Sequence, residues 1–288
     1  MANLYCSIYN GLGNQLFGYA LGLHIAEKYD KKLYIDLTKM NLVNFLSSLG
    51  IKKDTRRKYE LDKLGFTDPI KNITIFEVLK KFKTSEKGSY IIGDFRKSHK
   101  NFEAINDNQN IYTIGWGDFN IVKEILPKMR TQFAPNFKIT TQFSKTKNTI
   151  IESNSVAIHI RRTDFLNPKL SGNFWGMCTD EYYNNAIQSI KEKVKNPVFI
   201  IFSDDIEYVR ENMNFENSFI VEGNTGYEDL YLMSLCKHFI LANSTFGFWA
   251  AILNDKKNKT VCVPEYWYNS PLRMADYIPE EWERIDIK

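Results

Sequence analysis

The stretch SVAIHIRRTDF, Ser155 to Phe165, is a hydrophobic run that ends in two adjacent arginines and an aspartate. Its first six residues have the length and apolar character of a buried strand. Charged side chains are rarely found deep in a core unless they are paired, so the arginines indicate where the strand leaves the core. A strand that only filled a core has no use for two guanidinium groups, and the pair is therefore a candidate functional position.

Two later strands also run into polar clusters. VFIIF (198–202) is followed by Ser203, Asp204 and Asp205, and HFILA (238–242) is followed by Asn243, Ser244 and Thr245. The intervals carry helical periodicity or short strands. We expect helices at 179–194, with Thr179 as the cap, and at 205–213, 227–236 and 246–253, and short strands at 218–221 and 260–263, the last one. This alternation predicts a parallel, doubly wound sheet.

The first forty residues contain a smaller unit of the same kind. LYCSIY (4–9) is a predicted strand, GLGN a turn, and LYIDL (33–37) a second strand, with a helix between them that Asn14 is expected to cap. We also expect a strand at 90–95, a helix at 118–133 interrupted by Pro127, and short helices and loops within 41–110. The polar segment 140–149 is the expected linker, which gives two domains, 1–145 and 150–288.

Composition restricts the function further. The 288 residues are 43% hydrophobic and carry a net charge of +4, which favours an anionic substrate and is far from a nucleic-acid footprint. The four cysteines show no CxxC spacing, so structural zinc is disfavoured and a reduced compartment is expected. With neither a signal peptide nor an apolar stretch of about 20 residues, we expect a soluble cytoplasmic protein. The basic residues 52–53 and 56–58 are either solvated surface or a peripheral membrane contact.

The strand-end clusters suggest a nucleotide pocket. Ligands of open parallel sheets bind beyond the carboxyl ends of the strands, so the three clusters are expected to converge. Arg161 and Arg162 suit phosphate oxygens, Asp204 suits ribose hydroxyls or the donor edge of guanine, and helix-start N–H groups near Ser244 suit an anion. Each cluster has a structural alternative, since an internal ion-pair network or a helix cap uses the same residue types.

Other signals are weak or absent. His159 lies in an apolar run two residues before Arg161, so in a strand the two side chains are expected to point the same way. Such a histidine is more often a core residue than a ligand. The GLGN turn lacks the GxGxxG spacing of dinucleotide-binding folds, and no GxxxxGK[ST] sequence occurs. An oxidoreductase and a P-loop nucleotidase are therefore both disfavoured.

In this combination of motifs the chain resembles the inverting α-1,2-fucosyltransferases of glycosyltransferase family 11. The resemblance extends in order over nearly the whole chain, and region 41–110 matches least well. It rests on these stretches: GLGNQLFGYALG, HIRRTDF, EYYNNAI, FSDDIEYVREN, EDLYLMSLCKHFILANSTFGFWAAIL and VPEYW. The resemblance implies two Rossmann-like halves facing a cleft (GT-B-like), parallel sheets flanked by helices, a GDP-sugar donor, and no metal or other cofactor.

The resemblance also implies roles for individual residues. Arg161 matches the arginine that holds the diphosphate, Asp204 an aspartate that contacts guanosine, and Asn14 an asparagine beside the reacting phosphate. Asp164 matches an acid whose role is mainly structural or base-contacting. The implied catalytic residues are Arg161, Asn14 and Asp164, and the implied donor-binding residues are Gly13, His159, Arg161, Arg162, Asp204, Asn243, Ser244, Thr245 and Phe246.

The function implied is transfer of L-fucose from GDP-β-L-fucose to the 2-hydroxyl of a terminal β-galactose in an oligosaccharide. Another GDP-6-deoxyhexose such as colitose or rhamnose, another acceptor sugar, and a nucleotide-sugar-binding protein without turnover are the alternatives. The base that deprotonates the acceptor stays open between Asp164, Asp118 and the phosphate itself. Trp116, Trp175 and Trp249 are candidates for sugar stacking, with core packing as the other interpretation.

Overall fold

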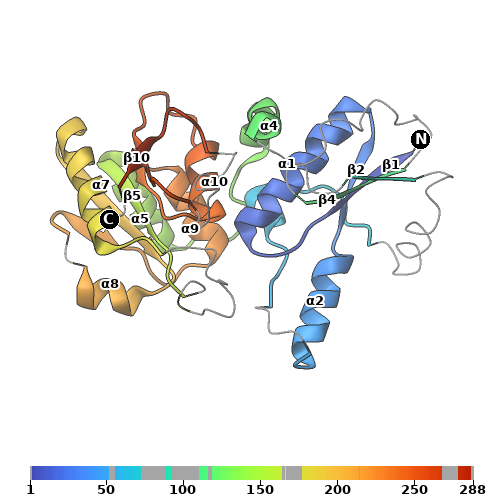
Figure 1. Ribbon diagram of the computed structural model, residues 1–288, viewed down its shortest axis with the longest axis horizontal. Coiled ribbons are helices and arrows are strands. Elements are labelled where there is room, and N and C mark those ends of the chain that lie inside the picture. Colours follow the sequence, from blue (N-terminus) through green and yellow to red (C-terminus); the bar gives the residue numbers. More distant parts are fainter. Residues whose placement is uncertain are drawn as a thin grey trace. The chain divides into compact units, whose positions relative to one another are not determined.

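The computed structural model divides the chain into two compact units, Met1–Asn136 and Phe137–Lys288. It describes residues 2–51, 56–72, 110–115, 119–163, 166, 177–213, 215–267 and 278–286, and the backbone of 89–92. Both units alternate strands and helices and contain parallel sheets flanked by helices (Figure 1). The predicted α/β class is confirmed.

The expected linker at 140–149 is wrong, because this segment forms helix α5 (Thr141–Glu152) of the second unit. Thr140 caps the helix by accepting a hydrogen bond from the Phe143 backbone N–H at 3.1 Å. Phe143, Thr146 and Ile150 are its buried residues. One face of the helix is thus held by only two large apolar side chains, too few for its periodicity to stand out in the sequence.

The sheet of the first unit has the strand order β2-β1-β4-β3, and its described pairs are all parallel. Its strands are β1 (Asn3–Ser7), β2 (Lys32–Asp36), β3 (Ser89–Ile92) and β4 (Asn110–Ile114). Three of them overlap predicted strands. Sequence analysis missed β4, which pairs with β1, because its buried residues are Ile111, Tyr112 and the polar Thr113, which form too short an apolar run to be recognised.

The helices of the first unit are α1 (Leu12–Lys28), α2 (Thr38–Ser48), the 3₁₀ helix η1 (Leu61–Leu64) and α4 (Phe119–Gln132). The prediction that Asn14 caps α1 is wrong. Gly11 is the cap residue, with extended backbone angles and no side-chain cap, and Asn14 is already the third helical residue. Pro127 lies inside α4, and the helix is not interrupted there.

Two glycines let α1 pack closely on β1. A Cβ atom at Gly22 would lie 2.7 Å from Cys6 Sγ, and one at Gly18 would lie 3.2 Å from Ile8 Cδ1. The Cys6 thiol donates to the Gly18 carbonyl oxygen at 3.1 Å. The helix that follows the GLGN turn is therefore held against the first strand by small residues, which fixes the position of the turn.

The sheet of the second unit has the strand order β10-β9-β8-β5-β6-β7, also parallel in every described pair. Its strands are β5 (Asn154–Ile160), β6 (Pro197–Ser203), β7 (Ser218–Ile220), β8 (His238–Ile240), β9 (Val261–Pro264) and β10 (Glu283–Ile285). The expectation that 260–263 is the last strand is wrong. Strand β10 adds an edge of three residues, too short to be recognised in the sequence.

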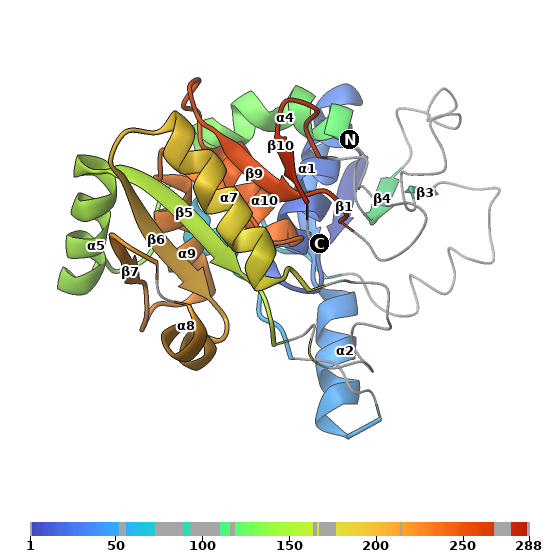
Figure 2. The same ribbon diagram turned by 60° about the vertical axis from the view of Figure 1, so that its left-hand side comes forward.

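Helices cover both faces of this sheet, as in a doubly wound fold. They are α7 (Asp180–Lys193), α8 (Ile206–Asn212), α9 (Gly226–Ser234) and α10 (Thr245–Leu253), besides α5. Helix α7 crosses one face, and α9 and α10 lie on the other (Figure 2). Thr179 caps α7 as predicted, accepting from the Tyr182 backbone N–H at 3.2 Å.

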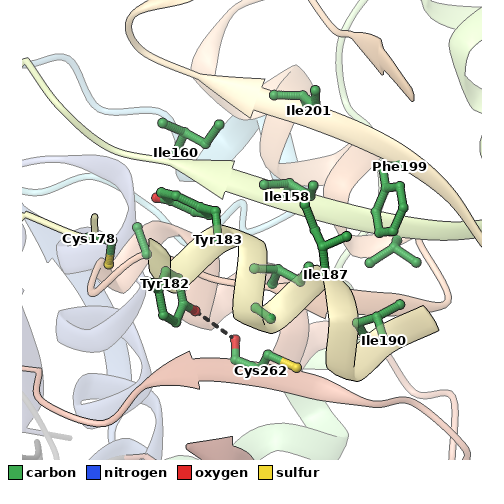
Figure 3. Close-up of a cluster of buried hydrophobic side chains, with 14 of the residues drawn as sticks. Ile158, Ile160, Cys178, Tyr182, Tyr183, Ile187, Ile190, Phe199, Ile201 and Cys262 are labelled. Atoms are coloured by element: carbon green, nitrogen blue, oxygen red, sulfur yellow. Dashed lines mark hydrogen bonds between the residues drawn. The ribbon is translucent and has the colours of Figure 1, made fainter. Parts of the chain in front are cut away.

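The core under α7 contains two buried tyrosines, Tyr182 and Tyr183, whose rings pack edge to face with their centroids 5.0 Å apart (Figure 3). The Tyr182 hydroxyl donates to the carbonyl oxygens of Leu241 at 2.6 Å and Cys262 at 3.3 Å. The Tyr183 hydroxyl donates to the carbonyl oxygen of His159 at 3.2 Å. These bonds tie α7 to the carboxyl ends of β5 and β8, where the predicted site lies.

Candidate functional site

The three polar clusters of the second unit converge, as predicted. Strands β6, β5 and β8 are neighbours, and the chain turns from one side of β5 to the other between β7 and β8. Such a switch point is where open parallel sheets leave room for a ligand. The Ala242 backbone N–H donates to the His159 carbonyl oxygen at 3.1 Å, so the strand-end segments after β5 and β8 lie side by side.

Asp204 organises the segment that follows β5. Its Oδ2 accepts from Arg161 Nη1 at 2.9 Å and from the Thr163 hydroxyl, and its Oδ1 accepts from the Arg162 backbone N–H at 2.9 Å. The Arg161 side chain is 25% exposed. One carboxylate thus orients a guanidinium that still reaches solvent. Contact of Asp204 with a guanosine stays a prediction, since both of its oxygens already accept hydrogen bonds.

Arg162 is held by a different set of contacts. Its Nε donates to Asp205 Oδ2 at 3.2 Å, and its guanidinium carbon lies 3.2 Å from the centre of the Tyr208 ring. Asp205 caps α8 through the Tyr208 backbone N–H, and the Tyr208 hydroxyl donates to Asp180. Strand β5 has ended before Arg162, so strand alternation does not set its direction. These contacts give Arg162 a structural role beside any contact with a ligand.

His159 is a buried neutral imidazole on the α10 side of the sheet. It is 5% exposed, and its Nδ1 has no hydrogen-bond partner. Burial, followed by the Arg161 charge, lowers its pKa to about 4. The ring lies 5.4 Å from the Phe246 ring, and a Cβ atom at Gly247 would be 2.8 Å from Nδ1. His159 therefore spaces α10 from strand β5, which Arg161 follows directly.

The segment after β8 is turned partly inward. The Asn243 amide donates to the Trp267 carbonyl oxygen at 3.0 Å, and the side chain is 2% exposed. Ser244 caps α10 through the Phe246 backbone N–H at 3.3 Å, and Thr245 is the first helical residue. Trp249 is fully buried in this helix, so the hypothesis that it stacks on a sugar is wrong.

Asp229 is a candidate functional residue that sequence analysis missed. It lies in the first turn of α9, the helix that leads into β8, and accepts from the Asn224 amide at 3.0 Å. Burial raises its pKa to about 7. A carboxyl group that keeps its proton near neutral pH differs from an ordinary surface acid in a helix first turn. The sequence gives no sign of the raised pKa, because acids in the first turn of a helix are common; only the tertiary structure, which desolvates this carboxyl group, reveals it.

In the first unit, the GLGN turn is fastened by Gln15, which is fully buried. Its amide donates to the carbonyl oxygens of Asn10 at 3.0 Å and Lys58 at 2.7 Å, and its Oε1 accepts from the Glu60 backbone N–H. The Arg57 guanidinium lies 3.9 Å from the position a Cβ atom would take at Gly11. The turn therefore carries a neighbouring cation that sequence analysis did not associate with it.

Comparison with known proteins identifies the family. Residues 138–286 match the family described as Glycosyl transferase family 11. An α-1,2-colitosyltransferase from Escherichia coli is 32% identical over 287 residues, covering 96% of each chain. The chain belongs to glycosyltransferase family 11. The predicted family is confirmed, and the protein is a glycosyltransferase.

Two other similarities are more limited. Galactoside α-(1,2)-fucosyltransferase 2 from Rattus norvegicus is 32% identical over 108 residues, which are 35% of this chain and 30% of the rat protein. The structure of a mutant of FUT1 from Arabidopsis thaliana in complex with GDP matches with a TM-score of 0.52 at 12% identity. It covers 96% of this chain and 74% of the plant chain, and this likeness supports the fold alone.

The predicted site residues of this family 11 member fall into three groups. Those of the second unit surround the carboxyl ends of β5, β6 and β8, whereas Gly13 and Asn14 lie in the first turn of α1 in the first unit. Asp164, Asp118, Trp116 and Trp175 lie outside the described residues. Within the ranges that are described, no group of three His, Cys, Asp or Glu side chains is placed to hold a metal ion.

A cavity of about 590 Å³ lies at the opposite edge of the second sheet, at the amino ends of β9 and β10. It is lined by Lys193, Lys257, Lys259, Glu281 and Glu283 among others. Lys193 pairs with Glu283 at 2.5 Å, and Lys259 donates to the Ala251 carbonyl oxygen at 2.8 Å. The cavity is thus separate from the strand-end clusters and has mixed charge.

Proposed function

We propose that this protein is an inverting galactoside α-1,2-fucosyltransferase. It transfers L-fucose from GDP-β-L-fucose to the 2-hydroxyl of a terminal β-galactose and uses no metal ion. The observation that carries the proposal is the Arg161 guanidinium, oriented by Asp204 at the switch point of a parallel sheet and still reaching solvent. Family membership and the α-1,2 linkage in the names of two relatives support the reaction type.

The chemistry needs little from the protein beyond charge and orientation. Cleavage of the bond between the sugar and GDP develops positive charge on the anomeric carbon and negative charge on the departing diphosphate. A guanidinium fixed in advance stabilises that negative charge without reorganising during the reaction. In the proposal Arg161 performs this task, and Asp204 keeps its planar group in place.

Two further parts of the proposal concern Asn14 on the donor side and the base that deprotonates the acceptor. Asn14 is proposed to lie beside the reacting phosphate, as the family resemblance implies. The proton of the attacking hydroxyl passes to Asp164, to Asp118 or to the phosphate itself. His159 is a poor choice for this base, because its imidazole is buried and its pKa is lowered to about 4.

The test is turnover of GDP-fucose with lactose in the absence of added metal, following released GDP and the trisaccharide. Arg161→Ala is expected to lower kcat/KM by about 10²–10³, the loss typical of a removed oxyanion donor. Arg210→Ala is the matched control, since Arg210 lies on the same unit in an exposed pair with Glu222. Near-normal turnover by Arg161→Ala would eliminate the assignment of this arginine.

GDP-colitose is a second donor candidate, because the colitosyltransferase relative matches along nearly the whole chain. Colitose is L-fucose without its 3-hydroxyl. A site built to bind that hydroxyl discriminates strongly against the sugar lacking it, whereas a site that merely tolerates it discriminates weakly. The test is competition between the two GDP-sugars for one acceptor, with GDP-rhamnose as a third donor. The ratio of their kcat/KM values shows whether the site discriminates strongly or weakly between GDP-fucose and GDP-colitose.

A further inference from the structure

Helix α2 of the first unit exposes large apolar side chains to solvent. A surface helix normally buries its apolar face. Here Leu42, Phe45 and Leu49 are 39%, 58% and 56% exposed, while Met40 is the buried residue of the helix. At about 100° per residue, Leu42, Phe45, Leu46 and Leu49 fall within one arc of about 100°. We call these four side chains the α2 stripe.

The inner face of the same helix is partly polar. Asn44, on the side of Met40, donates its amide to the Arg57 carbonyl oxygen at 2.7 Å and accepts from the Arg57 backbone N–H at 2.9 Å. This two-bond contact fastens the segment after the helix against α2. Figure 1 shows α2 extending away from the sheet of its unit, beyond the carboxyl end of β2.

The exposed apolar residues are concentrated at this place. Ile51, just after the helix, is 69% exposed, which makes four exposed large hydrophobic residues within 42–51. Among the other described residues, the exposed large hydrophobics are scattered: Ile70, Ile139, Ile151, Leu166 and Met177. Scattered ones need no explanation, but a contiguous group marks an interaction surface.

The positive charge of the chain is concentrated in the same segment. Residues 38–58 contain six cations (Lys39, Lys52, Lys53, Arg56, Arg57 and Lys58) and one acid, Asp54, a net charge of +5. The whole chain has 38 cations and 34 acids, so the remaining residues carry 32 cations and 33 acids. The entire positive excess of the protein therefore lies in the 21 residues that contain the α2 stripe.

We propose that the α2 stripe, together with the basic residues Arg56, Arg57 and Lys58 beside it, binds the surface of an anionic lipid membrane. An apolar stripe next to a cluster of lysines and arginines matches the boundary between acyl chains and negatively charged headgroups. Eleven residues of helix are about 16 Å long, roughly half of a hydrocarbon core, so α2 lies along the surface. In the part of the chain that is described, no helix is long and apolar enough to cross a bilayer.

The test is co-sedimentation of the full chain with vesicles of phosphatidylcholine alone or of equal parts phosphatidylcholine and phosphatidylglycerol. We expect binding to the anionic vesicles that is at least about tenfold tighter than to the neutral ones and weakens with added salt. Phe45→Ser with Leu49→Ser, and separately Arg56→Glu with Lys58→Glu, are each expected to weaken binding about tenfold or more.

Matched controls come from the second unit. Ile151→Ser removes an isoleucine that is 51% exposed, and Lys195→Glu with Lys257→Glu reverses two exposed charges. These are expected to bind anionic vesicles within about twofold of the unaltered protein. An unchanged thermal midpoint shows that a variant is folded, and because neither the midpoint nor co-sedimentation involves turnover, this result is independent of the proposed function.

Several outcomes overturn the proposal. One is equal binding to neutral and anionic vesicles, or none to either. Another is binding by the Phe45→Ser/Leu49→Ser variant that equals that of the controls. A third is a concentration-dependent dimer that this variant abolishes while vesicle binding is absent, which would make the stripe an interface between two copies of this chain.

Discussion

Gly247 lies where α10 passes the buried imidazole of His159, and its replacement by alanine tests how the site is held. In a helix, Gly→Ala at a compatible position stabilises by about 0.4–1 kcal/mol. Here the added Cβ would lie 2.8 Å from His159 Nδ1 and 3.2 Å from Leu241 Cδ2. The leucine methyl can shift, but the imidazole is 5% exposed and packed against Phe246, so it has little room.

Overpacking of this kind costs about 1–3 kcal/mol, which exceeds the gain in helix propensity. We therefore expect Gly247→Ala to lower the stability of the second unit by about 1–2 kcal/mol, and its thermal midpoint by about 2–8 °C. His159 precedes Arg161 by two residues, so the same shift should raise the KM for the GDP-sugar. Calorimetry and steady-state kinetics measure the two effects.

The control is Gly226→Ala at the start of α9, where an added Cβ would meet nothing within 4 Å. It is expected to leave stability unchanged or to raise it by up to about 1 kcal/mol, without effect on KM. If Gly247→Ala is as stable as Gly226→Ala, the view that the imidazole is immobile and sets the spacing of α10 is wrong.

Three further predictions follow from individual contacts. Asp229 keeps its proton in the folded protein to about pH 7 but ionises near 3.8 when unfolded, so it costs stability increasingly as the pH rises between these values. Asp229→Asn should therefore gain urea stability over the unaltered protein from pH 5 to pH 8, and a constant difference would contradict this. Arg162→Lys should lower the thermal midpoint more than Arg161→Lys, because it loses the Tyr208 ring contact, whereas Arg161→Lys should lower turnover more; the opposite order refutes the division of roles. Thr140→Ala removes the cap of α5 and should cost about 1 kcal/mol in chemical denaturation, unlike Thr141→Ala one residue later.

The elements of the second unit were largely predictable. Strands β5, β6 and β8 are continuous apolar runs with polar ends, and Thr179 precedes a first turn rich in acids. Such signals act within a few residues and survive without knowledge of the fold. The failures occurred where that local signal is thin, as in β4, β10 and the helix taken for a linker.

For the candidate site, the sequence predicted the location but not the contacts of the individual side chains. That three strand ends meet follows from the alternation of strands and helices in the sequence, because parallel strands bring their carboxyl ends to one edge. The different contacts of the two arginines could not be predicted from this alternation. Arg161 and Arg162 are adjacent in sequence, yet one is oriented by Asp204 at the protein surface and the other is packed on Tyr208.

The amino-acid sequence by itself determined the α/β class, the helix cap at Thr179, the family motifs and the concentration of positive charge in residues 38–58. These depend on residue type and short-range spacing. Only the tertiary structure decided which carboxylate each arginine meets, that Asp229 is partly buried, and that the apolar stripe of α2 faces outward. The physical reason is that ion pairs, desolvation and exposure depend on neighbours brought close by the order of the strands and the packing of the helices, and those neighbours are distant in the chain.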